Sequence, residues 1–325
     1  MTNKKYDVVA LGELLIDFTE NGLSEQGNPL LEANPGGAPC NVLSMLQKLG
    51  DKTAFIGKVG NDGFGHLLTK AVQEQGIDTT GLVYDNDVHT TLALVLKKEN
   101  GDRDFAFYRN PGADMNLKEE EVNESLIASS SIFHFGTLSL TDESVKMATQ
   151  KAVKAAKENG LTITFDPNLR EPLWRSLEEA HEQVAWGLQQ ADVVKISDNE
   201  ITWFTGMDNY DEGIAFLQKE YPNLKLICLS MGGDGSKAVY RDIHVAYPAF
   251  LQEATIETTG AGDTFCACKI HTVLENGIDH LDEEKLKEML KFANAAASLV
   301  TTKKGALRVM PTKEEVETFI ENFKR

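Results

Sequence analysis

The sequence predicts an α/β fold in which a mainly parallel sheet is covered on both faces by helices, with a small β-element beside it. Three observations support this fold. Short apolar runs recur along the chain, longer helix-like stretches separate many of them, and two segments rich in Thr, Val, Leu and Phe break the alternation. Strands that alternate with helices are typical of a parallel sheet buried between two helical layers.

The apolar runs have the length of strands and are too short for helices. We expect buried strands at residues 6–11, 53–56, 131–135, 161–165, 193–196 and 226–230. The segments expected to form helices include residues 141–159, residues 263–275 and an alanine-rich stretch at residues 292–300. The second of these ends before Asn276-Gly277, a pair that favours helix termination.

Two segments predict the small β-element, residues 14–19 and residues 89–108. The second has Asn100-Gly101 at its centre, and Asn-Gly between two β-prone runs is a strong hairpin signal. No Pro- or Ser-rich linker, repeat or low-complexity tract separates these segments from the rest of the chain. We therefore expect a single domain over residues 1–325, with the small sheet formed by about 13–35 and 88–112.

Composition limits the classes of function. The 325 residues are 42% apolar and 25% charged, and the formal net charge of −18 is spread along the chain. Such a surface repels nucleic acid and anionic membranes, so neither is an expected partner. To bind a polyanionic ligand such as ATP, the protein would need backbone N–H groups, a few cations and a bound metal that overcome the repulsion from its negative charge.

The cysteines and the first residues of the chain predict a location. Cys40, Cys228, Cys266 and Cys268 lack the spacing of zinc ligands and are interpreted as reduced thiols. The chain leads directly into an apolar strand without a signal peptide, and no apolar run is long enough to span a bilayer. These features predict a cytoplasmic protein.

The run Thr259-Gly260-Ala261-Gly262-Asp263 stands at the start of an expected helix. Small residues let consecutive N–H groups converge at a helix N-terminus, where the dipole adds positive potential, so the run predicts an anion hole. Asp263 could accept a proton from a hydroxyl that attacks a bound phosphoryl group. Position alone leaves open that Asp263 only caps the helix.

Other small-residue runs predict ligand contacts. Gly36-Gly37-Ala38-Pro39-Cys40-Asn41 lets a ligand approach the backbone, and Asn41 offers donors and acceptors to sugar hydroxyls, although a turn before a helix would give the same pattern. Asp17 is a lone acid in an apolar strand-like stretch, where it either binds hydroxyls or is an edge-strand charge. Residues 231–235 follow a strand and predict a ligand crevice or a simple turn.

Taken together, these runs resemble the PfkB, or ribokinase-like, carbohydrate kinase family over essentially the whole chain. The N-terminal signature is matched by Gly36, Gly37, Pro39, Asn41, Gly50 and Gly60, and the C-terminal one by the run from Thr259 to Phe265. Residues 107–114 and 166–174 are similar to the fructokinase branch. The resemblance implies a ribokinase-like three-layer αβα fold with a β-sheet lid, and transfer of the ATP γ-phosphoryl group to the 6-hydroxyl of D-fructose.

The resemblance also implies roles for single residues. Asp263 would be the catalytic base, the backbone of Gly260, Ala261 and Gly262 the anion hole, and Arg170 a stabiliser of charge. The residues implied in sugar binding are Asp17, Gly36, Gly37, Asn41, Arg109, Asn168 and Asp263. Those implied in nucleotide binding are Ser197, Ser230, Gly232, Gly233, Gly235, Gly260, Gly262 and Asn294. Surface ion pairs remain an alternative for Arg109 and Arg170.

The implied cofactors are ATP, Mg²⁺ and K⁺. Glu200 would order Mg²⁺ through water as part of an Asn-x-x-Glu motif, whose first position is Ser197 in this chain. Glu257, Thr301 and Gly305 would form the K⁺ site, with Glu257 where relatives often have Asp. A lid sheet with an exposed apolar face also predicts a homodimer.

There are three alternatives to this function. Another kinase of the family, acting on 2-keto-3-deoxygluconate, ribose or a riboside, differs in only one or two lid residues. A catalytically silent sugar sensor would share the fold, although an intact Asp263 argues against it. A NAD-dependent oxidoreductase would need a Gly-x-Gly-x-x-Gly turn after the first strand, which residues 11–15 do not supply.

Overall fold

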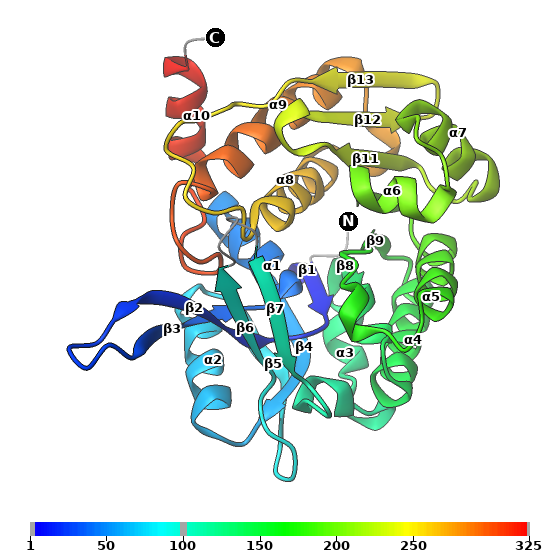
Figure 1. Ribbon diagram of the computed structural model, residues 1–325. Helices are drawn as coiled ribbons and strands as arrows, with labels where there is room; N and C mark the ends of the chain where they lie inside the picture. The colour runs from blue at the N-terminus through cyan, green and yellow to red at the C-terminus, as the bar shows by residue number, and fades with distance from the viewer. Residues whose placement is uncertain (1–3, 98–102, 324–325) are drawn as a thin grey trace.

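The computed structural model describes residues 4–97 and 103–323, which form two sheets surrounded by helices (Figure 1). The large sheet has nine strands in the order β13 (Ile243–Tyr247), β12 (Ser236–Tyr240), β11 (Leu226–Ser230), β10 (Val193–Ser197), β9 (Thr162–Asp166), β8 (Ser130–Gly136), β1 (Tyr6–Leu11), β4 (Thr53–Gly60) and β5 (Asp78–Asp85). All neighbours from β5 to β11 are parallel, and β12 and β13 add an antiparallel edge. The predicted α/β fold with a mainly parallel sheet is confirmed.

Each of the six strands expected from the apolar runs is present in this sheet. Three strands are missing from the prediction, β5, β12 and β13. Because β5 and β13 are the two edges of the sheet, they bury only some of their residues and lack a continuous apolar run. The prediction therefore located the buried centre of the sheet and missed its margins.

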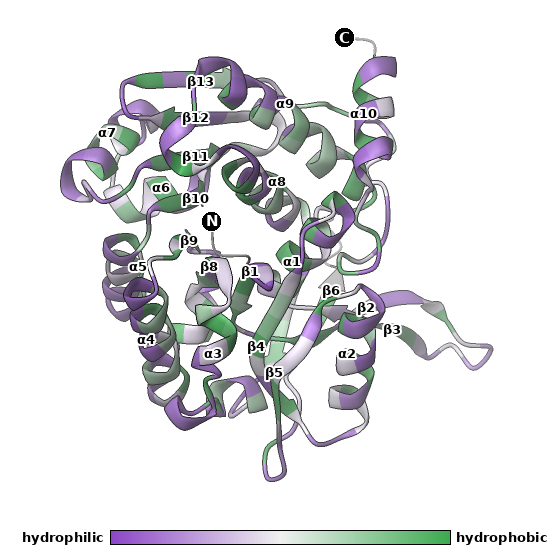
Figure 2. Cartoon of the chain, turned by 180° about the vertical axis from the view of Figure 1, so that it is seen from behind, coloured by the Kyte–Doolittle hydropathy of each residue, from purple (hydrophilic) through white to green (hydrophobic). Residues whose placement is uncertain are grey.

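Two helical layers cover the large sheet. The helices are α1 (Ala38–Leu49), α2 (Gly63–Glu74), α3 (Glu124–Ala128), α4 (Glu143–Glu158), α5 (Leu177–Gln190), α6 (Asp198–Thr205), α7 (Tyr210–Glu220), α8 (Ala261–Asn276), α9 (Glu283–Val300) and α10 (Lys313–Asn322). Alternate strand residues point to opposite faces, so Val8 and Ala10 pack with α1, α8 and α9, and Val9 and Leu11 pack with α4 and α5. Hydrophobic residues accordingly gather on central strands such as β4, and hydrophilic ones on the outer helices (Figure 2).

The small sheet is built from the two predicted segments. Its strands lie in the order β3 (Pro29–Gly36), β2 (Leu15–Leu23), β6 (Leu92–Lys97) and β7 (Arg103–Tyr108), and a parallel pairing of β2 with β6 joins two antiparallel pairs. The turn expected at Asn100-Gly101 lies outside the described residues. The β2–β3 hairpin projects from the body of the molecule and exposes Leu23, Leu30 and Leu31 (Figure 1).

The order of the elements places several chain ends at one edge of the large sheet. The carboxyl ends of β1, β8, β9, β10 and β11 meet there because these strands are parallel. Helices α1 and α8 pack against each other and begin at the same edge, close to the small sheet (Figure 1). In the described part of the chain, no helix combines the length and the apolar character needed to cross a membrane.

Candidate active site

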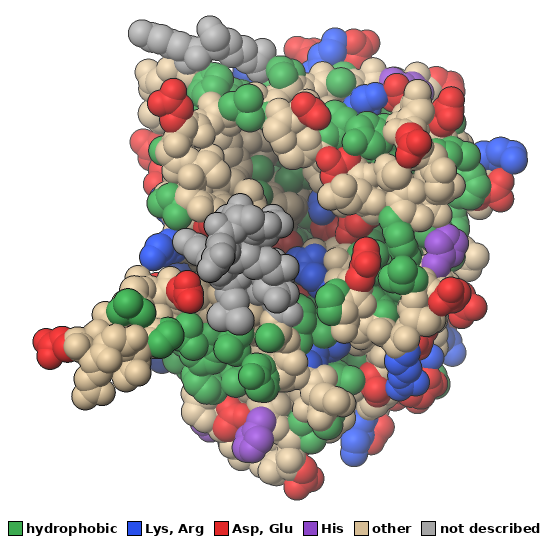
Figure 3. All heavy atoms as spheres, in the orientation of Figure 1, with side chains coloured by type: hydrophobic (Ala, Val, Ile, Leu, Met, Phe, Trp, Pro, Cys, Tyr) green, Lys and Arg blue, Asp and Glu red, His purple; other side chains and the backbone are tan. Residues whose placement is uncertain are grey.

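A cavity of about 250 Å³ lies between the small sheet and the first turns of α1 and α8. The molecular surface is hollowed at the centre of the view in Figure 3. The walls of the cavity include Glu13, Asp17, Asn34, Gly37, Asn41, Phe107, Leu138, Asn168, Arg170, Glu257, Thr258, Gly262, Asp263 and Gly305. The cavity therefore brings together residues from the first signature, the second signature and the segment around residue 170, which are far apart in the sequence.

The first turn of α8 depends on glycine. Gly260 is the N-cap with φ +77°, and a Cβ on it would lie 2.7 Å from the Ala306 side chain. A Cβ on Gly262 would lie 3.2 Å from the Nζ atom of Lys195. The first N–H groups of a helix have no intrahelical acceptor. Here the Ala261 N–H group donates to the Thr258 carbonyl at 3.2 Å, outside the helix. The anion hole at this turn stays a prediction.

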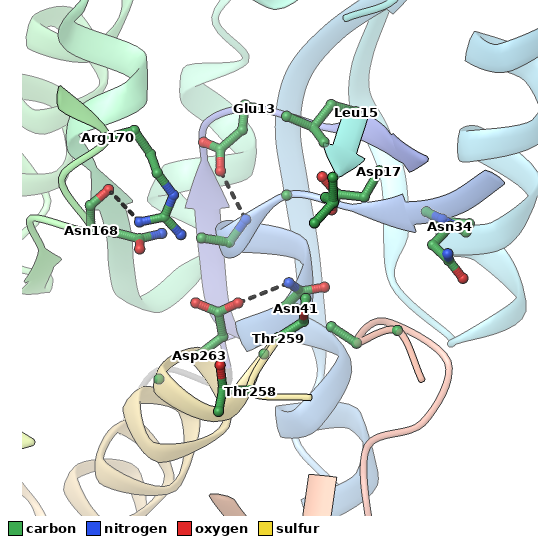
Figure 4. A pocket seen from close by; sticks show the side chains of 18 of the residues that line it. Glu13, Leu15, Asp17, Asn34, Asn41, Asn168, Arg170, Thr258, Thr259 and Asp263 are labelled. Atoms are coloured by element: carbon green, nitrogen blue, oxygen red, sulfur yellow. Dashed lines mark hydrogen bonds between the residues drawn. The ribbon is translucent and has the colours of Figure 1, made fainter. Parts of the chain in front are cut away.

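Asp263 lies in that first turn but does not cap it. The N-cap is Gly260, without a side-chain cap hydrogen bond, and Asp263 Oδ2 instead accepts a hydrogen bond of 2.8 Å from Asn41 Nδ2 (Figure 4). Burial raises the pKa of Asp263, although the Asn41 hydrogen bond and the charges of Lys195 and Arg170 oppose the rise. A carboxylate with a raised pKa is a better proton acceptor near neutral pH than an ordinary aspartate.

Asp17 enters the same cavity from β2 (Figure 4). A Cβ on Gly36 would collide with Asp17 Oδ2, so glycine at this position leaves the space that the carboxylate occupies. Burial raises the pKa of Asp17 to about 7; Arg170 opposes the rise, and Asp263 and Glu257 add to it. Hydroxyl groups that donate to this carboxylate would stabilise its charged form.

Replacing Gly36 with Ala should displace the Asp17 carboxylate without changing its chemistry. We expect the KM for the sugar to rise roughly tenfold, the loss of about one hydrogen bond to a charged group, while kcat changes less. Steady-state kinetics measure both. Gly63→Ala is the matched control, because a Cβ on Gly63 meets no atom within 4 Å. An unchanged KM in a folded Gly36→Ala protein would contradict this account of Asp17.

Asn168 and Arg170 reach the cavity on a loop after β9. Asn168 has a positive φ of 44°, and the Leu169 N–H group donates to Glu200 Oε1 at 2.8 Å. The other Glu200 oxygen accepts from the Ser197 N–H group, and the Ser197 hydroxyl accepts from Glu200 N, which completes a capping box at the start of α6. Ser197 and Glu200 thus lie behind the loop and position it; their predicted roles toward ATP and Mg²⁺ stay predictions.

A second cavity of about 340 Å³ lies on the other side of the α8 N-terminus. Its walls include Ser230, Gly232, Gly233, Gly235, Phe250, Leu251, Thr258, Ala261, Gly262, Phe265, Asn294, Ala297 and Thr301. The Asn294 amide donates to the carbonyls of Tyr247 and Pro248 at 3.0 and 3.2 Å, so it shapes this wall. Both cavities share Thr258 and Gly262. Two ligands bound in them would meet at the anion hole.

Arg109 is placed differently from the other predicted sugar ligands. It is buried, and its guanidinium donates to Asp114 Oδ2 at 2.8 Å, Thr141 Oγ1 at 2.8 Å and the Leu138 carbonyl at 2.9 Å. Arg109 does not line the cavity, whereas Leu138 does. In this geometry Arg109 supports the cavity wall through a buried ion pair, which differs from both the sugar contact and the surface ion pair considered from the sequence.

The residues predicted to hold K⁺ lie together. Glu257 Oε1 accepts a hydrogen bond of 2.6 Å from Gly305 N, and the Thr301 carbonyl accepts one of 2.8 Å from Ile256 N. Within residues 4–97 and 103–323, no group of three or more His, Cys, Asp or Glu side chains is arranged to hold a metal ion. In phosphoryl-transfer enzymes, Mg²⁺ is commonly bound by one or two carboxylates, water and substrate phosphates. Such a site does not require three side chains of these types.

Two charged residues of the site were missed by the sequence analysis. Glu13 is 4% exposed and accepts a hydrogen bond of 2.8 Å from the Ala38 N–H group, and burial raises its pKa to about 7. Lys195 is 5% exposed and lies 3.2 Å from Asp166, beneath Gly262. A lone lysine within the apolar strand at residues 193–197 is a signal that could have identified the second of them.

Two cavities that meet at a helix N-terminus, with the buried Asp263 carboxylate in the wall of the first, suit the transfer of a phosphoryl group from a nucleotide to a small hydroxyl compound. The chain matches the family described as pfkB family carbohydrate kinase over residues 5–313. It belongs to that family.

Relatives and solved structures agree with this membership. The chain is 41% identical over 316 residues to probable fructokinase-2 of Arabidopsis thaliana, covering 96% of this chain and 95% of the relative. A fructokinase of Xylella fastidiosa with bound ATP superposes with a TM-score of 0.88 at 29% identity, covering 97% of this chain and 98% of that one. A fructokinase of Vibrio cholerae O395 in a form with fructose, ADP and calcium ion has a TM-score of 0.87 at 28% identity, covering 97% and 99%.

Proposed function

We propose that the protein phosphorylates D-fructose at its 6-hydroxyl with ATP, giving fructose 6-phosphate and ADP. The observation that carries the proposal is the pair of cavities that share Thr258 and Gly262, with Asp263 facing the first cavity. The polar first cavity suits a sugar, and the more apolar second one suits the adenosine part of ATP. Relatives named fructokinase match the chain over nearly its full length, which favours fructose as the acceptor.

The sugar is held by groups on opposite walls of the first cavity. The Asp17 carboxylate accepts from hydroxyls, and Asn41 lies in the opposite wall, although its Oδ1 atom is buried in the empty site. Asn41 Nδ2 meanwhile holds Asp263 in place. This arrangement orients one hydroxyl toward both Asp263 and the anion hole, and such orientation accounts for much of the catalysis of phosphoryl transfer.

Asp263 then receives the proton of the attacking 6-hydroxyl. The new bond joins that oxygen to the γ-phosphorus of ATP, and the bond from the γ-phosphorus to the β,γ-bridging oxygen breaks, so ADP leaves with the electron pair. N–H groups in the first turn of α8 donate to the transferred group, with the positive charges of Lys195 and Arg170 close to the same turn. The small sheet closes the sugar cavity as a lid and limits hydrolysis of ATP by water.

The residues present fit Mg²⁺ bound mainly through the ATP phosphates. Glu200 is the carboxylate that would hold it through water, and its existing hydrogen bonds from the Leu169 and Ser197 N–H groups argue against direct ligation of a tightly held ion. When bound, Mg²⁺ would neutralise phosphate charge.

We propose that K⁺ binds at the loop of Glu257, Thr301 and Gly305. We also propose that two chains pair through the exposed β2–β3 hairpin.

A coupled assay of ADP release tests the proposed acceptor. The panel comprises fructose, ribose, glucose, 2-keto-3-deoxygluconate and inosine, each with Mg²⁺ and ATP, with and without K⁺. We expect kcat/KM for fructose to exceed the others by roughly 10²-fold, because a site built to hydrogen-bond specific hydroxyls rejects sugars that lack them. A higher value for any other acceptor would overturn the assignment of fructose, and sugar-independent ADP release alone would overturn the kinase assignment.

A further inference from the structure

Arg109 and Asp114 form a buried ion pair where the small sheet joins the rest of the molecule. Their side chains are each 2% exposed. The Nε atom of Arg109 donates to Asp114 Oδ2 at 2.8 Å, and its Nη2 atom lies 2.7 Å from the same oxygen. Neither residue lines the first or the second cavity. The pair therefore acts on the site, if at all, through the segments that it connects.

The pair connects the two ends of the β6–β7 segment. Arg109 directly follows β7, and Thr91 directly precedes β6. The Thr91 hydroxyl donates to Asp114 Oδ1, the oxygen that Arg109 leaves open. A Cβ on Gly112 would collide with Thr91 Oγ1 and lie 2.9 Å from Asp114 Oδ1, so glycine leaves the space for this contact. One carboxylate thus holds the beginning of β6 and the end of β7 together.

The Arg109 guanidinium also binds the segment that follows β8. Its Nη1 atom donates to Thr141 Oγ1 at 2.8 Å, and its Nη2 atom donates to the Leu138 carbonyl at 2.9 Å. The Thr141 hydroxyl donates to the same carbonyl at 2.9 Å. Because β8 belongs to the large sheet, these bonds fix the end of the small sheet to the body of the molecule.

The connected segments each supply a wall of the first cavity. Val95 on β6, Phe107 on β7 and Leu138 after β8 line it. The Arg109–Asp114 pair therefore sets how the small-sheet walls lie relative to the Leu138 wall. Buried ion pairs add little net stability over apolar residues, but a fully hydrogen-bonded one can hold a single geometry.

We propose that Arg109, Asp114 and Thr91 are positioning residues that hold β6 and β7 over the first cavity, so that Val95 and Phe107 contact the sugar and exclude water from the attacking hydroxyl. The proposal rests on the proposed function, since it requires a sugar in that cavity. A cover held in place favours transfer of the phosphoryl group to the sugar over transfer to water.

The test is Thr91→Val, which keeps the shape of the side chain and leaves the ion pair intact. We expect the KM for fructose to rise roughly tenfold, as for a misplaced binding wall, with the KM for ATP unchanged. ADP should also exceed the sugar phosphate formed in the same reaction, because water reaches the phosphoryl group. Thr91→Ser retains the hydroxyl and should restore both values. An unchanged KM for fructose in a folded Thr91→Val protein would overturn the proposal.

Thr53→Val is the matched control for a general loss of stability. Thr53 is 2% exposed, begins β4, and its hydroxyl accepts a hydrogen bond of 2.9 Å from Gln47. It lines neither cavity. Its loss should lower the melting temperature while the KM for fructose and the ratio of ADP to sugar phosphate stay unchanged. An equal rise of KM in Thr53→Val would show a structural effect only and overturn the positioning role.

A second readout does not depend on the proposed reaction. Hydrogen exchange followed by mass spectrometry on the free protein should show roughly tenfold faster exchange in β6 and β7 of Thr91→Val, but not of Thr91→Ser or Thr53→Val. If Thr91→Val does not fold, Gly112→Ala replaces it, because its Cβ would displace the Thr91 hydroxyl. Unchanged exchange overturns the proposal. Absence of sugar kinase activity in the unmodified protein overturns the proposed function instead, and exchange then decides whether these residues hold the two strands.

Discussion

Replacing Asp263 with Ala should lower kcat by roughly 10²–10⁴-fold, the range expected when a general base is removed. The carboxylate lies in the first turn of α8, lines the proposed sugar cavity and is held by Asn41, so its loss removes the proposed proton acceptor while the other walls of the cavity remain. Sugar affinity should therefore change little. Steady-state kinetics give kcat, and isothermal titration calorimetry with fructose gives the affinity.

Asp263→Asn is the control that separates chemistry from shape. The amide keeps an oxygen that can accept the hydrogen bond from Asn41 Nδ2, but it cannot take up a proton at neutral pH. We expect a loss of kcat similar to that of the alanine variant, with an unchanged melting temperature. Near wild-type turnover in either variant would show that another group is the base.

Replacing Asp17 with Ala should raise the KM for fructose by about 10²-fold or more, because two hydrogen bonds to a charged carboxylate are each worth about 1.5–3 kcal/mol. Asp17 lies on β2, across the cavity from the first turn of α8 where we propose that transfer takes place, so kcat should fall less than KM rises. Steady-state kinetics over a wide range of fructose concentration measure both. An unchanged KM would place the sugar elsewhere.

Because the pKa of Asp17 is raised, fructose affinity should also depend on pH. Burial raises that pKa to about 7 in the empty site, and hydroxyl donors favour the ionised form, so fructose affinity should increase as pH rises through about 7. Binding near pH 7 should release protons, which calorimetry detects as a dependence of the binding enthalpy on the buffer. In Asp17→Asn the affinity should be lower and should depend less on pH; Glu13, which lines the same cavity and whose pKa burial also raises to about 7, accounts for the remainder.

Much of the fold could be predicted because the central strands are buried on both faces. Continuous apolar runs identified β1, β8, β9, β10 and β11, whose carboxyl ends meet at the edge of the sheet where the site lies. Edge strands carry no such run. The two segments of the small sheet were predicted, but the parallel register of β2 with β6 depends on contacts between residues more than 70 positions apart, which no local pattern reveals.

The site was also partly predictable from the sequence. Small residues before a helix form either a turn or a surface that a ligand can approach, so residues 36–41 and 259–263 pointed to a ligand site, and the structure places both runs at one cavity. The direction of Arg109 was not predictable, because an arginine beside polar residues can face a ligand or a buried partner such as Asp114. Glu13 and Lys195 escaped notice because their partners come from other elements.

The strongly acidic composition makes a buried lysine relevant to function. A net charge of −18 disfavours ATP, yet the first turn of α8 has the Lys195 side chain beneath Gly262. Charges in a buried environment are screened less than surface charges. Local positive potential at the anion hole can therefore outweigh the distant negative surface.

The central proposal is transfer of the γ-phosphoryl group to the 6-hydroxyl of fructose, and the position of the phosphate in the product tests it most directly. The protein would be incubated with ATP, Mg²⁺ and fructose carrying carbon-13 at C6, and the product examined by phosphorus-31 NMR. We predict a new sugar-phosphate resonance split by two-bond coupling to the labelled carbon. A sugar-phosphate resonance without that coupling, as for phosphate at C1, would contradict the proposal, as would the absence of any sugar phosphate.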